Sequence, residues 1–147
     1  MSVAISPYRE TDHRATARLW LESWRSTGLA VAQQASESVL LDRIPRELAA
    51  GWDMHLAWDD GELAGFLALK PASRCLDQLF VAPEAQSRGI GRTLLDFAKD
   101  RLPGGLWLRT AADNIRACRF YERNGLRRGE TQIHPTLGHQ TVIYRWP

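Results

Sequence analysis

The sequence predicts an α/β (α+β) domain in which helices flank both faces of a mixed central sheet of about seven strands. Apolar residues alternate in some segments, which is typical of strands, and recur every three to four positions in others, which is typical of helices. These segments predict the element order β-α-α-β-β-β-α-β-α-β-β. The chain has 147 residues, 44% of them hydrophobic, which suits a single domain over residues 1–147 with a real core. Near residues 79–92, an apolar strand passes through a glycine-containing loop directly into an amphipathic helix.

The charge balance and the cysteine content give no indication of a nucleic-acid-binding, membrane or metal-binding protein. There are 19 basic and 17 acidic residues, spread along the chain, for a formal net charge of +2. This balance does not favour a nucleic-acid or membrane surface. No segment approaches the ~20 apolar residues of a membrane span and no signal-peptide pattern is visible, so we expect a cytoplasmic protein. Cys75 and Cys118 show no ligand spacing with the four histidines, so we expect no metal site.

The first third of the chain predicts one strand and two helices. Val3–Ser6 is the candidate strand, and a helix capped near residue 12 runs to about Trp24 with one apolar face. Ser36–Leu48 has a second helical pattern. Pro45 lies inside it, and because proline lacks the N–H that a helix interior needs, we expect a kink or a split there.

The middle of the chain predicts four strands. Met54–Trp58 and Glu62–Leu69 flank the turn sequence Asp59-Asp60-Gly61 and predict an antiparallel hairpin. Cys75–Val81 is the strand that enters the glycine loop, and Gly105–Thr110 is a short apolar strand that we expect to be central.

The last third predicts a helix and a hairpin. Asp113 or Asn114 caps a helix that ends at Asn124-Gly125, where glycine supplies a left-handed C-cap. Leu126–Ile133 and Gln140–Trp146 then alternate as two final strands.

The loop between Val81 and the helix that starts near Gly89 to Thr93 predicts an anion site. The first turn of a helix has unpaired N–H groups and a partial positive charge, and glycine lets an anion approach the backbone. Arg88 and Arg92 add positive charge. The Walker and dinucleotide patterns are absent. The alternative is a tight strand-to-helix turn without a ligand.

Two motifs carry a resemblance to a known family. Gln86-x-x-Gly89-x-Gly91, after a strand that ends Val81-x-Pro83, resembles the acetyl-CoA-binding motif of the GCN5-related N-acetyltransferases (GNAT). Asn114-x-x-Ala117-x-x-Phe120-Tyr121-x-x-x-Gly125-Leu126 resembles the family's second motif, with Leu126 in place of the usual phenylalanine. The resemblance runs from about Val3 to the C-terminus, but its specific motifs lie within Leu79 to Leu126.

The resemblance implies acetyl-CoA as cofactor and direct transfer of its acetyl group, in a ternary complex, to a primary amine of a small molecule or peptide. We expect the strand before Pro83 and its parallel neighbour to part where proline removes a donor, so that a pantetheine arm pairs with the exposed main chain. The candidate cofactor-binding residues are Leu79, Phe80, Val81, Gln86, Ser87, Arg88, Gly89, Ile90, Gly91, Arg92, Thr93, Asn114, Ala117, Phe120 and Tyr121.

Two residues are candidates for proton transfer. Tyr121 could protonate the departing thiolate, since a phenol of pKa about 10 and a thiol of pKa about 8.5 are close. Its alternative role is as an aromatic packed beneath the sheet. Asp77 has the parity of Leu79 and Val81 and could act as general base, directly or through water. Alternatives are a structural Asp77, Glu22 or His134 as base, or no base at all.

The acceptor is not specified by the sequence. In the family, the loop between the first two helices lines the acceptor site, which makes Glu22 and Trp24 candidate substrate contacts together with His134. Trp24 could equally belong to the core. Homodimers occur in the family, and the sequence leaves this open. The alternative function is a non-catalytic acyl-CoA-binding or sensor module of the same fold.

Overall fold

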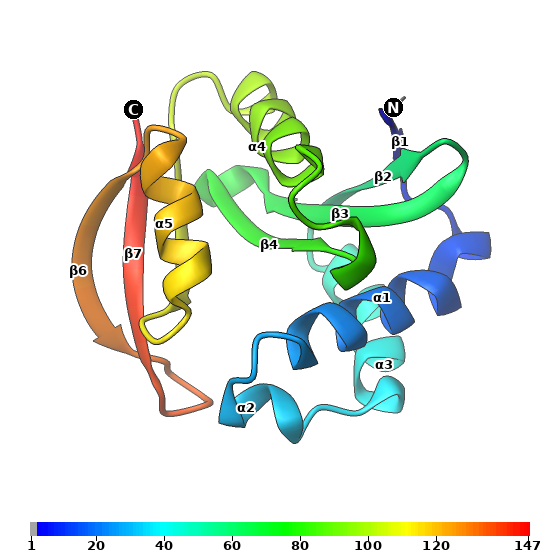
Figure 1. Cartoon of the computed structure of the whole chain (residues 1–147), viewed down its shortest axis with the longest axis horizontal. Coiled ribbons are helices and arrows are strands. Elements are labelled where there is room, and N and C mark those ends of the chain that lie inside the picture. Colours follow the sequence, from blue (N-terminus) through cyan, green and yellow to red (C-terminus); the bar gives the residue numbers. More distant parts are fainter. Residues whose placement is uncertain (1–2) are drawn as a thin grey trace.

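The computed structural model describes residues 3–147, and its centre is a seven-stranded mixed sheet of order β1-β2-β3-β4-β5-β7-β6 (Figure 1). Neighbouring strands are antiparallel except β4 and β5. The strands are β1 (Val3–Pro7), β2 (Asp53–Asp59), β3 (Glu62–Lys70), β4 (Cys75–Val81), β5 (Leu106–Ala111), β6 (Arg127–Ile133) and β7 (Gln140–Trp146).

Helices cover both faces of the sheet, as the sequence predicts. The helices are α1 (His13–Arg25), α2 (Ala30–Gln33), α3 (Glu37–Ala49), α4 (Ile90–Arg101) and α5 (Ile115–Arg123), of which only the four-residue α2 was not expected. Trp20 of α1 packs on Phe66 of β3, whereas the preceding residue of β3, Gly65, faces Leu94 of α4. Because side chains alternate along a strand, α1 and α4 lie on opposite faces.

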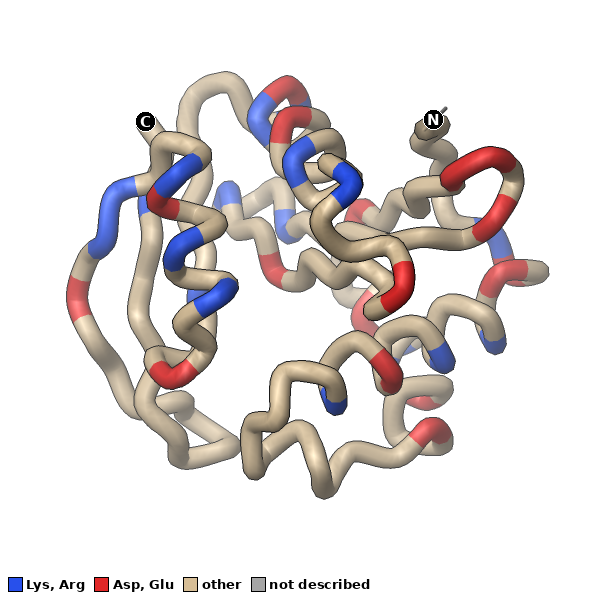
Figure 2. Tube along the Cα trace, in the orientation of Figure 1, with Lys and Arg blue, Asp and Glu red and all other residues tan. Residues whose placement is uncertain are grey.

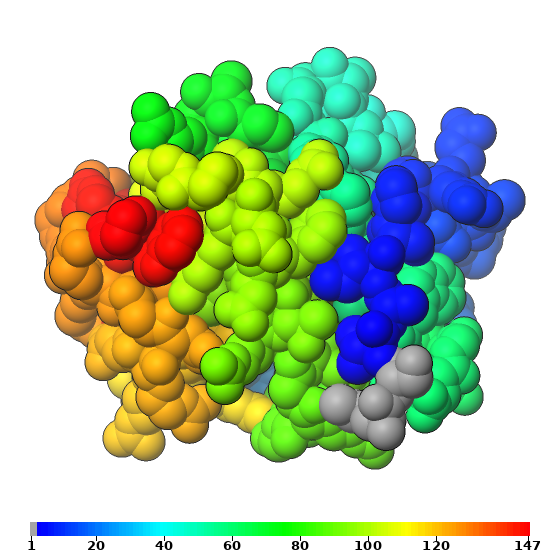
Figure 3. Space-filling view, turned by 90° about the horizontal axis from the view of Figure 1, so that it is seen from above, coloured from blue at the N-terminus to red at the C-terminus, as the bar shows by residue number. Residues whose placement is uncertain are grey.

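Figures 1 and 3 show the same arrangement from two directions. In Figure 1, α4 lies above β3 and β4, and α1 and α3 lie below them. Viewed from above, α4 fills the middle of the surface, between the C-terminal segment and β1 (Figure 3). The buried core is continuous from α1 through the sheet to α4, and it includes Trp20, Phe66, Leu94 and Leu95.

Proline does not split α3. Pro45 lies inside one helix that runs from Glu37 to Ala49. The missing N–H leaves the carbonyl of Leu41, four residues earlier, without its helical partner. His13 at the start of α1 replaces that partner, with its Nε2 2.7 Å from the Leu41 oxygen. A contact between two helices therefore satisfies the group that the sequence leaves unpaired. Of the two expected outcomes, a kink or a split, the split does not occur.

The parallel strands β4 and β5 pair at one position only. Cys75 is opposite Trp107, near the start of both strands, and no further pairs follow. The register of β4 against β3 slips between Leu76 and Gln78, which leaves Asp77 as the extra residue of a β-bulge. A bulge bends its strand and increases its twist. The strands thus part as expected, but from the bulge onward and far upstream of Pro83.

Candidate active site

Two cavities open along the gap between β4 and β5. The first, of about 600 Å³, lies between the Gln86–Arg92 loop and α5, and we call it the loop cavity. The second, of about 540 Å³, lies between α1, α3, β4, β5 and the β6–β7 turn, and we call it the hairpin cavity. The two are adjacent, since six residues line both: Thr27, Leu79, Phe80, Asn114, Ala117 and Tyr121.

The edge of β4 that borders the gap presents main-chain groups. The amide of Ala82 donates to Ala64 of β3, with N and O 2.7 Å apart, so even-numbered residues of this part of β4 bond to β3. The amides of Leu79 and Val81 therefore point the other way, where no β5 residue pairs with them. The Val81 carbonyl in the gap accepts bonds from Ser23 Oγ at 2.8 Å and Gln86 Nε2 at 3.1 Å. An extended ligand with amide groups could pair with this edge.

The loop before α4 has the geometry of an anion cradle. Ser87 and Gly89 both have left-handed backbone, with φ of 68° and 83°. A Cβ on Gly89 would meet nothing within 4 Å, so glycine is favoured there by conformation and not by space. A Cβ on Gly91, in contrast, would lie 3.3 Å from the ring of Phe120, so this glycine lets α5 approach α4. Free N–H groups of the first turn of α4 complete the cradle.

Arginines surround the loop cavity on two helices. Arg92 of α4 and Arg116 and Arg123 of α5 line it, and Arg116 Nη2 lies 3.2 Å from Ser87 Oγ. Figure 2 shows basic residues along α5 and near the start of α4, into which the loop leads. The α5 arginines were missed in the sequence, although their spacing of seven places both on one helix face. Backbone donors together with these cations fit a diphosphate group.

The structure brings most predicted cofactor-binding residues to the loop cavity. Three of them have side chains that contact other parts of the protein instead. Arg88 points to the β2–β3 hairpin, where it pairs with Asp59 at 3.5 Å. Ile90 is buried in the core, and Thr93 Oγ1 bonds the Gly89 carbonyl at 2.9 Å. These three residues do not line the loop cavity. The other twelve line the cavity: Leu79, Phe80, Val81, Gln86, Ser87, Gly89, Gly91, Arg92, Asn114, Ala117, Phe120 and Tyr121.

Tyr121 stands where the two cavities meet. Its ring packs against Phe120 and Tyr144, and only 7% of the residue is exposed. Its hydroxyl has no hydrogen-bond partner among residues 3–147, so it remains a free donor. Burial, and to a lesser extent Cys118, raises the pKa of Tyr121 well above its ordinary value. The phenol is therefore protonated throughout the physiological range.

Asn114 and Cys118 have structural roles on the same helix. The Asn114 side chain accepts a bond from the Ala117 amide at 3.2 Å and caps α5, which confirms the predicted cap. Cys118 is buried and free, and it lines neither cavity. Cys75 is also free.

Asp77 faces the hairpin cavity because of the bulge. Its Oδ2 accepts a bond from Trp52 Nε1 at 2.9 Å and lies 3.7 Å from Lys70 Nζ. Trp52 packs on Trp20, so Asp77 lies on the α1 face of the sheet. Val81 lies on the other face, next to Gly91 of α4. Asp77 thus lines the hairpin cavity. The parity argument was wrong, because the bulge reverses the side of the sheet on which Asp77 lies.

His134 is a hydrogen-bond donor to the hairpin cavity. Its Nδ1 accepts bonds from the amides of Thr136 at 3.2 Å and Leu137 at 3.0 Å, so the neutral ring carries its proton on Nε2. The ring stacks on His139 with centroids 5.1 Å apart. Burial, followed by His139, Arg109 and Arg43, lowers the pKa of His134. A ring in this state does not suit the general base considered from the sequence.

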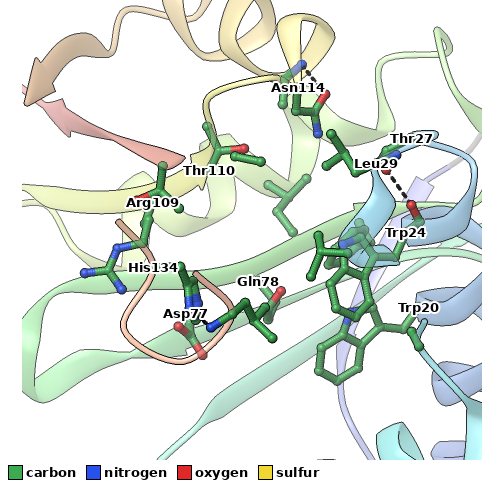
Figure 4. A pocket seen from close by; sticks show the side chains of 18 of the residues that line it. Trp20, Trp24, Thr27, Leu29, Asp77, Gln78, Arg109, Thr110, Asn114 and His134 are labelled. Atoms are coloured by element: carbon green, nitrogen blue, oxygen red, sulfur yellow. Dashed lines mark hydrogen bonds between the residues drawn. The ribbon is translucent and has the colours of Figure 1, made fainter. Parts of the chain in front are cut away.

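The hairpin cavity has a polar and an apolar wall. In Figure 4, Asp77, Arg109 and His134 lie on one side and Trp20 and Trp24 on the other. Trp24, a predicted substrate contact, lines this cavity. Glu22, the other one from α1, lines neither cavity, and its neighbour Ser23 lines the loop cavity. Arg43, Gln78, Arg109 and His139 also line it and were missed, because no local pattern distinguishes them.

Two searches of the described residues were negative. Among residues 3–147, no group of three or more His, Cys, Asp or Glu side chains is placed to hold a metal ion. None of the helices in the same range has the length and apolarity needed to cross a membrane.

Solved structures share this fold. An acetyltransferase from Thermus thermophilus matches 100% of this chain and 97% of its own, with a TM-score of 0.82 and 20% identity. The PaiA N-acetyltransferase of Thermoplasma acidophilum, solved with coenzyme A, has a TM-score of 0.72 and 22% identity over 99% of this chain and all of its own. The yncA protein of Salmonella typhimurium, solved with acetyl-CoA, has a TM-score of 0.74 and 12% identity over 99% and 94% of the two chains.

Sequence comparison finds characterised relatives and a family. The peptidyl-lysine N-acetyltransferase YiaC of Escherichia coli is 35% identical over 89 residues, 60% of each chain. The streptothricin acetyltransferase of Streptomyces lavendulae is 38% identical over 74 residues, which are 45% of this chain and 39% of that one. The matches thus span well under two thirds of these relatives. The model of the Acetyltransferase (GNAT) family matches residues 9–126. The two sequence motifs and the fold of this chain are therefore those of the GNAT family, to which the chain belongs.

Proposed function

We propose that this protein is an acetyl-CoA-dependent N-acetyltransferase that transfers the acetyl group directly to a primary amine of a small molecule or peptide. The observation that carries the proposal is the junction of the two cavities. A donor in the loop cavity and an acceptor in the hairpin cavity would meet beside Tyr121, without a covalent enzyme intermediate.

The loop cavity is the proposed site of the donor. Acetyl-CoA supplies a thioester, whose acetyl carbon is attacked by the amine. The N–H groups of the Gln86–Arg92 loop, with Arg92, Arg116 and Arg123, would hold the diphosphate. The free edge of β4 would pair with the pantetheine amides, and the Val81 amide, which points into the gap, would stabilise negative charge on the carbonyl oxygen.

Tyr121 is the proposed proton donor to the departing thiolate. Its raised pKa keeps the proton on the phenol until the reaction needs it. The same burial also raises the pKa of a thiol that leaves in this cavity, so the two groups stay matched.

Asp77 is the proposed proton acceptor for the amine. It is the carboxylate that lines the hairpin cavity, and its contacts with Trp52 and Lys70 engage Oδ2 and not Oδ1. Asp77→Asn is expected to lower kcat/KM. An unchanged kcat/KM would favour release of the amine proton to solvent instead.

Two measurements test the function. Calorimetry with acetyl-CoA should show binding, and thiol release across a panel of small amines and lysine peptides should show turnover. The relatives that act on peptidyl-lysine and on streptothricin support including both kinds of acceptor. Absence of binding would overturn the proposal. Binding without thiol release for any amine would favour the sensor alternative.

A further inference from the structure

The polar wall of the hairpin cavity contains an arginine without an acidic partner. Arg109 of β5 has Nη2 3.4 Å from Gln132 Oε1, and its guanidinium lies 5.8 Å from the centre of the Trp107 ring. Its Nε is buried and has no hydrogen-bond partner. No carboxylate among residues 3–147 forms an ion pair with it.

The other charges of the cavity are compensated. Arg43 pairs with Glu47 at 3.4 Å, and Asp77 lies 3.7 Å from Lys70. Both histidines of the β6–β7 turn also line the cavity, and His139 has a buried, unpartnered Nδ1. The excess charge of the cavity is therefore positive, and it is located at Arg109.

An unpaired guanidinium donor inside a cavity indicates an anionic ligand. Arginine has a planar fork of donors that matches a carboxylate, and Arg109 lines the cavity without a carboxylate partner among the described residues. A substrate with several positive charges and no negative one would be repelled at this wall.

The cavity also has apolar surface that is open to solvent. Four large apolar side chains are strongly exposed within residues 3–147, and two of them line this cavity: Val39 of α3 at 56% and Leu137 of the β6–β7 turn at 49%. Trp24, Leu29 and Val31 add apolar lining. Exposed apolar surface beside a cavity is typical of a site that binds an apolar group.

We propose that the acceptor is an amine that also carries a carboxylate and an apolar group, such as a free amino acid with an apolar side chain, and that Arg109 binds its carboxylate. The inference rests on the proposed acetyltransferase function. The amine would face Tyr121 and Asp77, the carboxylate would face Arg109, and the apolar group would contact Trp24 and Val39. A volume of about 540 Å³ is ample for such a molecule.

The test compares acids with their amides. Thiol release is measured with L-leucine, L-leucinamide, L-phenylalanine, L-phenylalaninamide and a lysine peptide. The enzymes are the wild type, Arg109→Gln, Arg109→Lys and the control Arg127→Gln, whose exposed arginine lines neither cavity. Circular dichroism confirms that each variant is folded.

The expected result is a preference of at least about tenfold in kcat/KM for the acid over its amide, the size of a charge-assisted hydrogen bond. Arg109→Gln should abolish the preference, Arg109→Lys should retain part of it, and Arg127→Gln should retain all of it. A better rate with amides or the lysine peptide, or a preference that survives Arg109→Gln, would overturn the inference.

A second readout does not need turnover. The amine-free analogue 4-methylpentanoate is titrated by calorimetry into the protein saturated with coenzyme A. Binding to the wild type that is lost in Arg109→Gln supports the inference, and equal or absent binding to both contradicts it. Failure of the proposed function is seen separately. In that case, the protein shows no binding when coenzyme A itself is titrated into it, before 4-methylpentanoate is added.

Discussion

The loop cavity and the hairpin cavity are built in different ways. The loop cavity comes from two short stretches, residues 79–92 and 114–124, with three residues of the end of α1 and the turn after it, and many of its donors are main-chain amides. The hairpin cavity takes side chains from α1, α3, β4, β5 and the β6–β7 turn. Main-chain hydrogen-bond donors persist under most substitutions, whereas side-chain hydrogen-bond donors do not. Binding of acetyl-CoA should therefore tolerate mutation, and the choice of the acceptor amine should change readily.

The largest expected effect is at the junction of the cavities. Tyr121→Phe removes the free hydroxyl and keeps the ring that packs on Tyr144. General acid catalysis contributes about 10²- to 10⁴-fold, so kcat should fall by about 10²-fold or more. The dissociation constant of acetyl-CoA should stay within about twofold. Tyr8→Phe, outside both cavities, is the control, and an unchanged kcat in Tyr121→Phe would exclude the proton-donor role.

The main-chain character of the loop cavity is tested at Gly89. Its φ of 83° is unfavourable for other residues by roughly 1–2 kcal/mol. Gly89→Ala should therefore distort the cradle and weaken acetyl-CoA binding about tenfold by calorimetry. Gly61→Ala in the β2–β3 turn is the matched control, with φ of 87° and equally open space around its Cβ. If both variants bind acetyl-CoA like the wild type, the cradle is not the diphosphate site.

The side-chain character of the hairpin cavity is tested at Trp24. Its ring is partly exposed at the apolar wall and also packs against the core. Trp24→Ala should raise the KM of the acceptor about fivefold, from the loss of part of the ~1.5–3 kcal/mol of a large apolar contact. Acetyl-CoA affinity should not change, since the residue does not line the loop cavity. Equal losses for both ligands would contradict the separation of the two sites.

The smallest effect is expected outside both cavities. Asp53 of β2 accepts bonds from Arg101 of α4 at 2.6 Å and from His55 at 2.8 Å. Burial alone raises the pKa of Asp53, but these two bonds outweigh it and lower the pKa overall. A lowered pKa means that the stabilisation is present above the unfolded value of about 3.9 and is lost as pH falls through the folded value.

Asp53→Asn should thus reduce the free energy of unfolding by about 1 kcal/mol at pH 7 and leave catalysis unchanged. The difference from the wild type should shrink below about pH 4. Urea denaturation at pH 7 and pH 3 measures both values. A constant difference across this range would mean that the carboxylate charge is not the source of the stabilisation.

Prediction from sequence succeeded where the determinants are local. The strand-to-helix loop follows from Gly89 and Gly91, and the start of α5 from Asn114, because these residues act on their own backbone. Most of the loop cavity was predicted for the same reason. At Pro45, local inference did not identify the partner of the released carbonyl, because that partner is His13, which is distant in sequence.

The amino-acid sequence by itself determined the order of strands and helices, the glycine loop and the cap of α5, since periodicity and backbone preference are properties of neighbouring residues. Only the tertiary structure decided where β4 and β5 part and which way Asp77 points, because both depend on a bulge in the register with β3. It alone brought Trp24, Arg109 and His134 around one cavity, since long-range packing and not chain proximity places them together.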